Sequence, residues 1–337
     1  MRGYEIAVRD EVRALHEDAL VLDLHNDLLT KLAHSRYDIG KRHAPQAYYN
    51  PLRLDLDVPR LRAGGVSGLG CLVFTGYRLA RQRRIGWEFA ALDRVLARYP
   101  DDLLLATTPA DLRRAKAEGK VGLFLGIESA DGVRAPDDLV PLHARGVRFF
   151  GAAWQHDTHA VKSSRTRGPD RGLSETGRAL VRACNRLGIL VDVSHASRRG
   201  VWDMHELSTV PVFASHAGAA GVKRHYRNLD DDQLRAIGRA GGVVGVIFCT
   251  YFLGGVFATL ERLADHIEHV ADVAGEDAVA LGSDMDGFVP LPRGLRDVAD
   301  LPRLTEVLWR RGFGERRLRK LLGENWLRYF ALAQPQE

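Results

Sequence analysis

The chain has 337 residues, of which 45% are hydrophobic, and a formal net charge of +5. This length suits one large α/β barrel or two ordinary domains. The densest basic runs, at 81–84 and 310–317, are short and interrupted. A nucleic-acid-binding protein would concentrate basic charge on one face, with aromatic side chains or a known motif. We therefore expect these basic residues to lie on solvent-exposed helix faces, and we expect no nucleic-acid partner.

The cysteines and the two ends of the chain indicate the compartment. Cys71, Cys184 and Cys249 are far apart and lie in strand-like or helical patterns, so we expect buried thiols rather than disulfides or metal ligands. The first 17 residues are charged and helical in pattern, unlike a signal peptide. No apolar run approaches the ~20 residues of a membrane span, and residues 331–337 form no hydrophobic anchor. We expect a cytoplasmic protein without a membrane partner.

Short apolar runs typical of buried strands alternate along the chain with amphipathic helical segments. A helix is predicted to start at Thr108-Pro109, with Pro109 at its first position, and another is predicted at 174–187, capped by Ser174 and ended by Gly188. The segments 37–50 and 156–173 look irregular, as expected of a lid or substrate wall. The predicted strands are 21–24, 68–74, 121–126, 149–153, 189–194, 212–214, 243–248 and 279–282.

Alternating strands and helices predict an α/β fold with parallel strands. Eight such units point to a (β/α)8 TIM barrel, which we expect to form a single domain over 1–337. An open, doubly wound sheet is the competing fold, and a dinucleotide-binding motif would support it. The nearest match, Gly65 to Gly70, runs into a strand instead of leading from a strand into a helix, so it gives little support.

Potential metal ligands follow five of these strands. His25 and Asp27 end the first strand and lie two residues apart, so their side chains point the same way. The others follow the third, fifth, sixth and eighth strands: Glu128, His195, His216 and Asp284. In a barrel, the carboxyl ends of all strands share one face. We therefore expect these three histidines and three carboxylates to meet in one pocket.

A metal site is the physical interpretation of such a cluster. Carboxylates at the mouth of an apolar barrel repel one another and resist desolvation, and divalent cations remove that cost. Mixed imidazole and carboxylate ligands suit zinc, with iron or manganese as alternatives. Five ligands exceed what one catalytic zinc usually takes, so two metals sharing a carboxylate use them better.

Each of these residues alone is weak support for a metal site. Glu128 could simply cap the next helix, and Asp284 or Asp286 could stand in a turn. It is their coincidence at five strand ends that favours the metal. Six other histidines are expected on polar helix faces or in loops, without a role: His16, His34, His143, His205, His266 and His269.

Motifs spread in order over nearly the whole chain resemble those of the membrane (renal) dipeptidase family of the amidohydrolase superfamily, which includes many bacterial members. The most specific are His25-Asn-Asp27, Asp192-Val-Ser-His195 and Gly-Ser-Asp284-Met-Asp286-Gly. Further matching stretches lie at 59–66, 126–128, 215–216, 227–231, 241–244 and 323–328. We expect no counterpart of the vertebrate members' membrane anchor.

The resemblance implies a centre with two Zn²⁺ ions, other divalent metals being alternatives. His25 and Asp27 would bind the first ion, and His195 and His216 the second. Glu128 would bridge the two ions. Relatives also suggest a homodimer.

The resemblance also implies roles beyond metal binding. Asp284 would take a proton from the water held between the metals and pass it to the leaving amine. Arg227 would pair with the substrate's C-terminal carboxylate, which a guanidinium can grip through two hydrogen bonds. Family members often have a histidine after the fourth strand that contacts the scissile group. Here that position is Trp154, with His156 two residues further on, so either residue could contact the substrate.

These points together predict a zinc-dependent dipeptidase that hydrolyses small L-Xaa-L-Xaa or L-Xaa-D-Xaa dipeptides. One alternative is an amidohydrolase acting on N-acyl amino acids or another small carboxylated amide, since a fold does not choose the substrate. The other alternative is a barrel that binds metal without catalysis. The intact ligand set and Asp284 argue against that last possibility.

Overall fold

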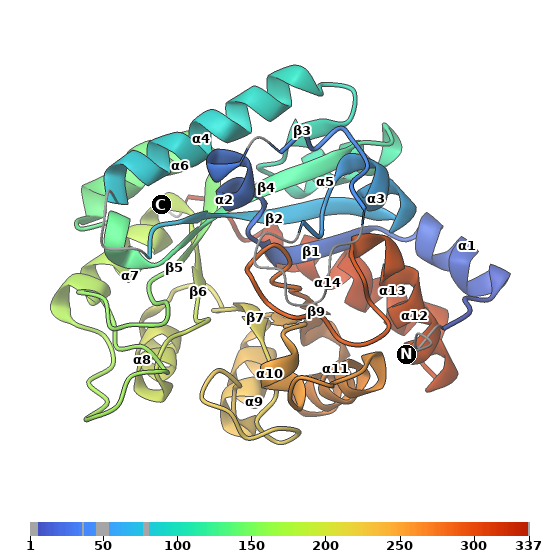
Figure 1. The fold of residues 1–337 in the computed structure, drawn as a ribbon. Helices are drawn as coiled ribbons and strands as arrows, with labels where there is room; N and C mark the ends of the chain where they lie inside the picture. Colours follow the sequence, from blue (N-terminus) through green and yellow to red (C-terminus); the bar gives the residue numbers. More distant parts are fainter. Residues whose placement is uncertain (1–5, 36, 45–53, 77–80, 336–337) are drawn as a thin grey trace.

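The protein was analysed as a computed structural model that describes residues 6–35, 37–44, 54–76 and 81–335 (Figure 1). Its strands form one parallel sheet in the order β6-β5-β4-β2-β1-β9-β8-β7, with β3 beside β4. The strands are β1 (Val21–Asn26), β2 (Val66–Phe74), β3 (Leu103–Leu105), β4 (Val121–Glu128), β5 (Val147–Gly151), β6 (Leu190–Asp192), β7 (Ala214–Ala217), β8 (Val244–Val246) and β9 (Val279–Leu281).

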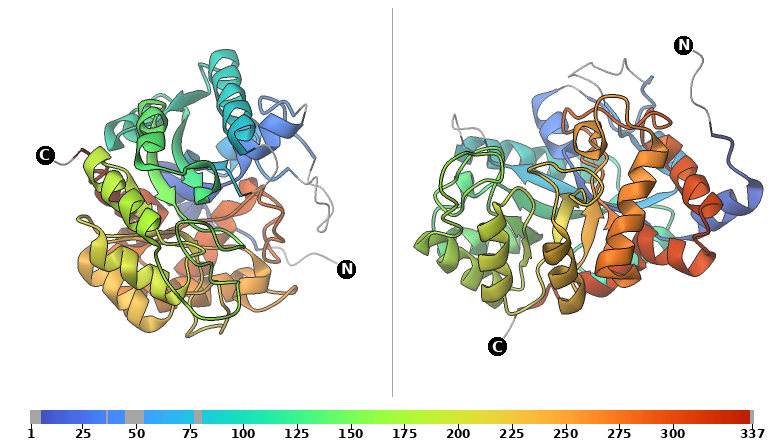
Figure 2. Two further views of the ribbon diagram at one scale, coloured as in Figure 1. Left: turned by 90° about the vertical axis from the view of Figure 1, so that its left-hand side faces the viewer. Right: turned by 90° about the horizontal axis from the view of Figure 1, so that it is seen from below.

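The two ends of this sheet come together. Asp192 of β6 and Phe213, just before β7, form a parallel bridge. The Val193 amide donates to the Phe213 carbonyl at 2.8 Å, and the Phe213 amide donates to the Val191 carbonyl at 3.1 Å. Eight strands therefore form a nearly closed barrel surrounded by helices, which confirms the predicted (β/α)8 TIM barrel (Figures 1 and 2).

The helices lie around the outside of the strands, as the two turned views show (Figure 2). The predicted helix after Thr108 is confirmed, since Thr108 caps α5 with Pro109 at its start. Ser174 caps α7 and Gly188 ends it with φ 71°, also as predicted. The helices are α1 (Asp10–Asp18), α2 (Leu28–His34), α3 (Val58–Ala63), α4 (Arg81–Arg98), α5 (Pro109–Ala117), α6 (Leu139–Ala144), α7 (Glu175–Leu187), α8 (Arg198–Leu207), α9 (Asp231–Ala240), α10 (Thr250–Leu253), α11 (Leu260–Ala274), α12 (Leu301–Arg310), α13 (Glu315–Arg319) and α14 (Asn325–Phe330).

An apolar plug fills the barrel beneath the carboxyl ends of its strands. Trp326 of α14 is fully buried. Its ring centroid lies 5.4 Å from that of Phe124 and 5.2 Å from that of Phe213. Phe149 of β5 joins the same cluster. Since an aromatic side chain buries a large apolar surface, this packing stabilises one end of the barrel and leaves the other for polar residues.

Some details differ from the sequence-based expectations. β3 was not predicted, because three leucines give too short a run to distinguish from a loop. His16 and His266 were expected on polar surfaces, but both are buried. His16 contacts Thr305 Oγ1 at 2.7 Å and the Gly64 carbonyl at 2.8 Å. His266 accepts from the Ala219 amide and lies 2.9 Å from the Leu253 carbonyl.

Other expectations hold. Cys71, Cys184 and Cys249 are free and buried. The segment 156–173 contains turns and isolated bridges instead of regular elements, as predicted. Of the irregular segment 37–50, residues 45–50 lie outside the described part. Among the helices of the described ranges, none combines the length and apolar character that a membrane crossing requires.

Candidate metal centre

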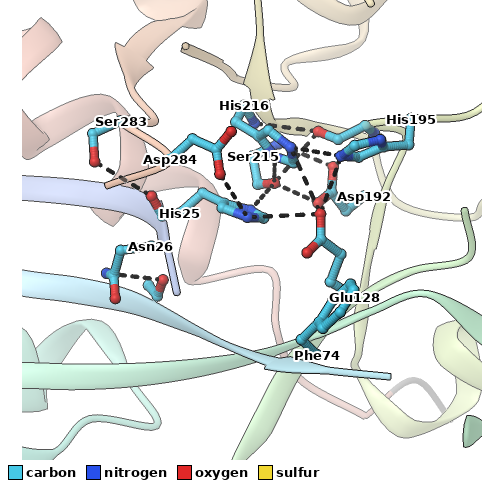
Figure 3. Close-up of polar contacts among 12 residues, drawn as sticks. His25, Asn26, Phe74, Glu128, Asp192, His195, Ser215, His216, Ser283 and Asp284 are labelled. Atoms are coloured by element: carbon cyan, nitrogen blue, oxygen red, sulfur yellow. Dashed lines mark hydrogen bonds and ion pairs between the residues drawn. The ribbon is translucent and has the colours of Figure 1, made fainter. Parts of the chain in front are cut away.

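The six predicted donors meet at the carboxyl ends of the strands, and Figure 3 shows five of them: His25, Glu128, His195, His216 and Asp284. Glu128 is the last residue of β4, and its Oε1 lies at the centre of the group. This oxygen is 3.1 Å from His195 Nε2, 3.7 Å from His25 Nε2 and 3.7 Å from His216 Nε2. Asp284 Oδ1 is 3.9 Å from His25 Nε2. Strands distant in sequence thus place three imidazoles around a common carboxylate.

Two overlapping sets of donors share Glu128. The first contains His25, Asp27 and Glu128, and the second contains Glu128, His195 and His216. Within each set the ligand atoms lie within 4.8 Å of one another. His216 also forms a third set with His25 and Asp284. This arrangement can hold two neighbouring metal ions with one carboxylate between them.

The backbone is strained where it presents some of these side chains. His195 has φ 65° and Asp284 has φ 61°, both in the left-handed region that residues other than glycine seldom adopt. Ser129, directly after Glu128, has φ 80°. Such strain costs roughly 1–3 kcal/mol per residue and clusters at functional sites, where the surrounding structure enforces it. Its coincidence with three strand ends supports a functional role for this face.

Burial sets the protonation of the group. It lowers the pKa of His25, His195 and His216 well below the ordinary value, so all three imidazoles are neutral near pH ~7, as metal ligands must be. Burial and the neighbouring carboxylates raise the pKa of Glu128 and Asp284 well above the ordinary value. Burial raises the pKa of Asp27 to about 6.

The donor atoms themselves fit divalent metals. His25 Nε2 is buried and has no hydrogen-bond partner among the described residues. His195 Nε2 and His216 Nε2 lie 2.9 Å apart and both face Glu128. Nitrogen lone pairs and carboxylates this close repel unless a proton or cation lies between them. Imidazole nitrogens with carboxylate oxygens are a donor set suited to zinc and similar ions.

Arg227 is buried beside this cluster. Its side chain is 5% exposed, and its Nη2 donates to the His216 carbonyl at 3.1 Å. Among the described residues, its Nε has no hydrogen-bond partner and no carboxylate forms an ion pair with the guanidinium. Burial lowers the pKa of Arg227, an effect that Asp284 and Glu128 oppose. A buried guanidinium with free donors is costly, and an anionic ligand would satisfy it.

A cavity with aromatic walls opens over the donors. Asp27, Glu128, His195 and Asp284 line it, together with Thr30, Phe74, Trp154, Gln155, Phe252, Gly287, Phe288 and Val289. The Trp154 ring stands edge-on to Phe74, with their centroids 4.7 Å apart. His156 is not among the lining residues, and its Nε2 contacts Asp131 Oδ2 at 2.6 Å. The structure therefore places Trp154, and not His156, in the cavity wall.

Two residues under the donors were missed by the sequence analysis. Asp192 and Ser215 lie beneath the imidazoles and are hydrogen bonded to each other (Figure 3). Both belong to motifs that carry ligands, Asp192-Val-Ser-His195 and Ser215-His216, so a signal existed. Their partners could not be known from the sequence, because they depend on how β6 and β7 align.

Comparison with known proteins identifies the family of the chain. The family model described as membrane dipeptidase (peptidase family M19) matches residues 9–336. A solved dipeptidase described as a metallopeptidase of family M19 shares 29% identity with a TM-score of 0.86, covering 94% of this chain and 99% of its own.

Two further solved structures are similar. A metallopeptidase from Rhodobacter sphaeroides, liganded with a phosphinate mimic of the dipeptide L-Ala-D-Ala, is 29% identical with a TM-score of 0.85, covering 95% of this chain and 100% of its own. An amidohydrolase from Pseudomonas aeruginosa is 26% identical with a TM-score of 0.83, covering 96% and 99%. The resemblance seen in the sequence motifs is confirmed: the chain belongs to the membrane dipeptidase family, peptidase family M19, and is a metallo-dipeptidase.

Proposed function

We propose that the protein hydrolyses small dipeptides, L-Xaa-L-Xaa or L-Xaa-D-Xaa, with two Zn²⁺ ions or other divalent metals. The observation that carries the proposal is the pair of donor sets sharing Glu128. His25 and Asp27 would hold one ion, His195 and His216 the other, and Glu128 both. Bound divalent ions supply an activated water at neutral pH and a Lewis acid for the peptide carbonyl.

Asp284 would handle the proton. Its side chain is 13% exposed, its Oδ1 lies 3.9 Å from His25 Nε2, and it lines the cavity. Burial and Asp27 raise its pKa above the ordinary value of an aspartate, which favours a carboxyl group that can carry a proton. In this role Asp284 accepts a proton from the attacking water and gives it to the leaving amine. The proton need not leave the cavity.

Arg227 would recognise the substrate. With Nη2 bonded to the His216 carbonyl, the guanidinium keeps other donors for a carboxylate. A free C-terminal carboxylate beside the metals would place the last peptide bond of the substrate over them, as cleavage of a dipeptide requires. The relative liganded with a mimic of L-Ala-D-Ala supports this class of substrate.

Trp154 and Phe74 would form the apolar wall against which a substrate side chain packs. A substrate contact for His156 stays a prediction, since its ring bonds to Asp131 outside the cavity lining. The single-domain organisation over 1–337, the homodimer and the cytoplasmic location likewise stay predictions of the sequence.

The test is a substrate screen with metal-free and reloaded protein. Chelated protein is expected to be inactive, and Zn²⁺ to restore hydrolysis of some L,L- or L,D-dipeptides. Activity that survives removal of all metal would overturn the proposal. Hydrolysis of N-acyl amino acids without any dipeptide would favour the alternative amidohydrolase. Binding of two zinc ions without hydrolysis of any substrate would favour a non-catalytic barrel.

A further inference from the structure

Ser215 Oγ is a shared contact of two of the imidazoles. It lies 2.9 Å from His25 Nδ1 and 2.9 Å from His216 Nδ1 (Figure 3). It is also 2.5 Å from Asp192 Oδ2. The serine is fully buried. In the proposed centre, His25 and His216 belong to different metal ions, so one hydroxyl contacts a ligand of each.

The hydrogen-bonding capacity of the Ser215 hydroxyl determines which of its contacts it donates to and which it accepts from. Ser215 has one hydrogen and two lone pairs. An Oγ–Oδ2 distance of 2.5 Å is typical of a hydroxyl that donates to a carboxylate. Asp192 Oδ1 accepts from the Ser194 and Ser215 amides at 2.9 and 3.0 Å, which leaves Oδ2 to accept from the Ser215 hydroxyl. The Ser194 hydroxyl, 3.4 Å from Ser215 Oγ, is a more distant neighbour. The single hydrogen of Ser215 therefore goes to Asp192.

Two lone pairs then remain for two imidazoles. Each Nδ1 must donate its hydrogen to Ser215, and in a neutral imidazole the other nitrogen is then unprotonated. Nε2 of His25 and of His216 consequently face Glu128 as lone pairs. If the hydroxyl donated to one imidazole instead, that ring would present an N–H to the centre and Asp192 Oδ2 would lose its short bond.

We propose that Ser215, oriented by Asp192, is a positioning residue that fixes the tautomer of one ligand in each of the two metal subsites. The inference rests on the proposed binuclear centre and deepens it. It makes the two subsites interdependent, because loss of one hydroxyl frees an imidazole in both. Groups that hold the far nitrogen of a metal-binding histidine typically change metal affinity about 10–100-fold when removed.

The backbone holds this hydroxyl in place. Cβ atoms added at Gly245 and Gly282 would lie 2.2 and 1.9 Å from the Ser215 carbonyl oxygen. Only glycine at these positions allows β8 and the residue that follows β9 to approach β7 this closely. Ser215 is therefore fixed between Asp192 and the imidazoles by the packing of three strands.

The chain also contains a matched control. Ser283 donates to Asp23 Oδ2 at 2.5 Å, and its amide donates to Asp23 Oδ1 at 2.7 Å. This pair repeats the geometry of Ser215 and Asp192 on β9 and β1, but Ser283 Oγ has no imidazole among its described hydrogen-bond partners. Ser283→Ala removes the same kind of bond without freeing a histidine ring.

The test compares Ser215→Ala with Ser283→Ala by ¹⁵N NMR of histidine side chains in metal-free protein. In the wild type and in Ser283→Ala, His25 and His216 are expected to carry hydrogen on Nδ1. In Ser215→Ala both rings should shift toward mixed tautomers. Competition with a chromophoric chelator should show Zn²⁺ binding weakened about 10–100-fold at both subsites, against near-wild-type binding in Ser283→Ala.

A second variant guards against misfolding of the first. Asp192→Asn keeps the shape, and because its amide oxygen accepts the two backbone N–H groups, its NH₂ would face Ser215 Oγ. The hydroxyl must then donate to one imidazole, so one of the two rings should switch to the other tautomer. Unchanged tautomers in both folded variants, or equal Zn²⁺ affinity in Ser215→Ala and Ser283→Ala, would overturn the inference. Wild-type protein that binds no metal would instead refute the proposed function, while the tautomer result stands by itself.

Discussion

Replacing Arg227 by methionine tests how the site selects its substrate. The change keeps an unbranched apolar stem, shortens the side chain by its guanidinium end, and removes its charge and its donors. Since Nη2 is committed to the His216 carbonyl, about two hydrogen bonds to a substrate carboxylate are lost, each worth about 1.5 kcal/mol when one partner is charged. The sum of about 3 kcal/mol corresponds to a roughly 100-fold fall in kcat/KM.

The assay pairs each dipeptide with its C-terminal amide, for example L-Ala-D-Ala with its carboxamide. The wild type should have a roughly 100-fold higher kcat/KM for the free acid than for the amide. Arg227→Met should lower that ratio to about one, because the uncharged amide forms no ion pair with Arg227 and loses little when the guanidinium is removed. Arg224→Met, an exposed arginine in the same loop, is the control and should keep the wild-type preference. If Arg227→Met still favoured the free acid as strongly as the wild type, the reasoning would be refuted.

Further predictions concern the proton shuttle, a buried acid, a crowded glycine and metal removal. Asp284→Asn should lower kcat by about 10²–10⁴-fold while Zn²⁺ stays bound, as kinetics and metal analysis together can check. Burial raises the pKa of Glu88 from 4.5 to about 8. Protonated Glu88 therefore stabilises the folded state fully below pH about 4.5, and this contribution is lost progressively as the pH rises to about 8. Glu88→Gln should therefore flatten the fall of stability with pH in denaturant unfolding of metal-free protein, and an unchanged slope would count against this assignment. A Cβ at position 287 would lie 2.4 Å from Asp284 Oδ1 and 2.6 Å from Asp27 Oδ2, so Gly287→Ala should weaken metal binding at least ~10-fold in chelator competition. Chelation should lower the unfolding temperature, because a metal ion present at a free concentration of ~100 times its Kd raises the free energy of unfolding by about 2.7 kcal/mol.

Much of the fold could be predicted from the sequence because barrel strands are short, apolar and separated by capped helices. Ser174 and Gly188 bound α7 by local chemistry alone. The positions of His25 and Glu128 at strand ends follow from the same pattern, since parallel strands in a barrel share one carboxyl face. What local patterns could not provide was β3, whose three leucines match β4 only through tertiary pairing.

The site was less predictable where it depends on three-dimensional packing. The hydrogen bond between Asp192 and Ser215 exists because β6 and β7 complete the barrel beside each other. The contact of His156 with Asp131 depends on the course of an irregular loop. The burial of His16 depends on Gly64 and Thr305, which are remote from it in sequence. No periodicity of the chain encodes such contacts.

The central claim is that two metal ions act together around Glu128. Its most direct test is a titration of metal-free protein with Zn²⁺ while hydrolysis of a dipeptide is followed. The account predicts full activity at two equivalents per chain and loss of that activity on chelation. Full activity at one equivalent, or activity without any metal, would contradict it.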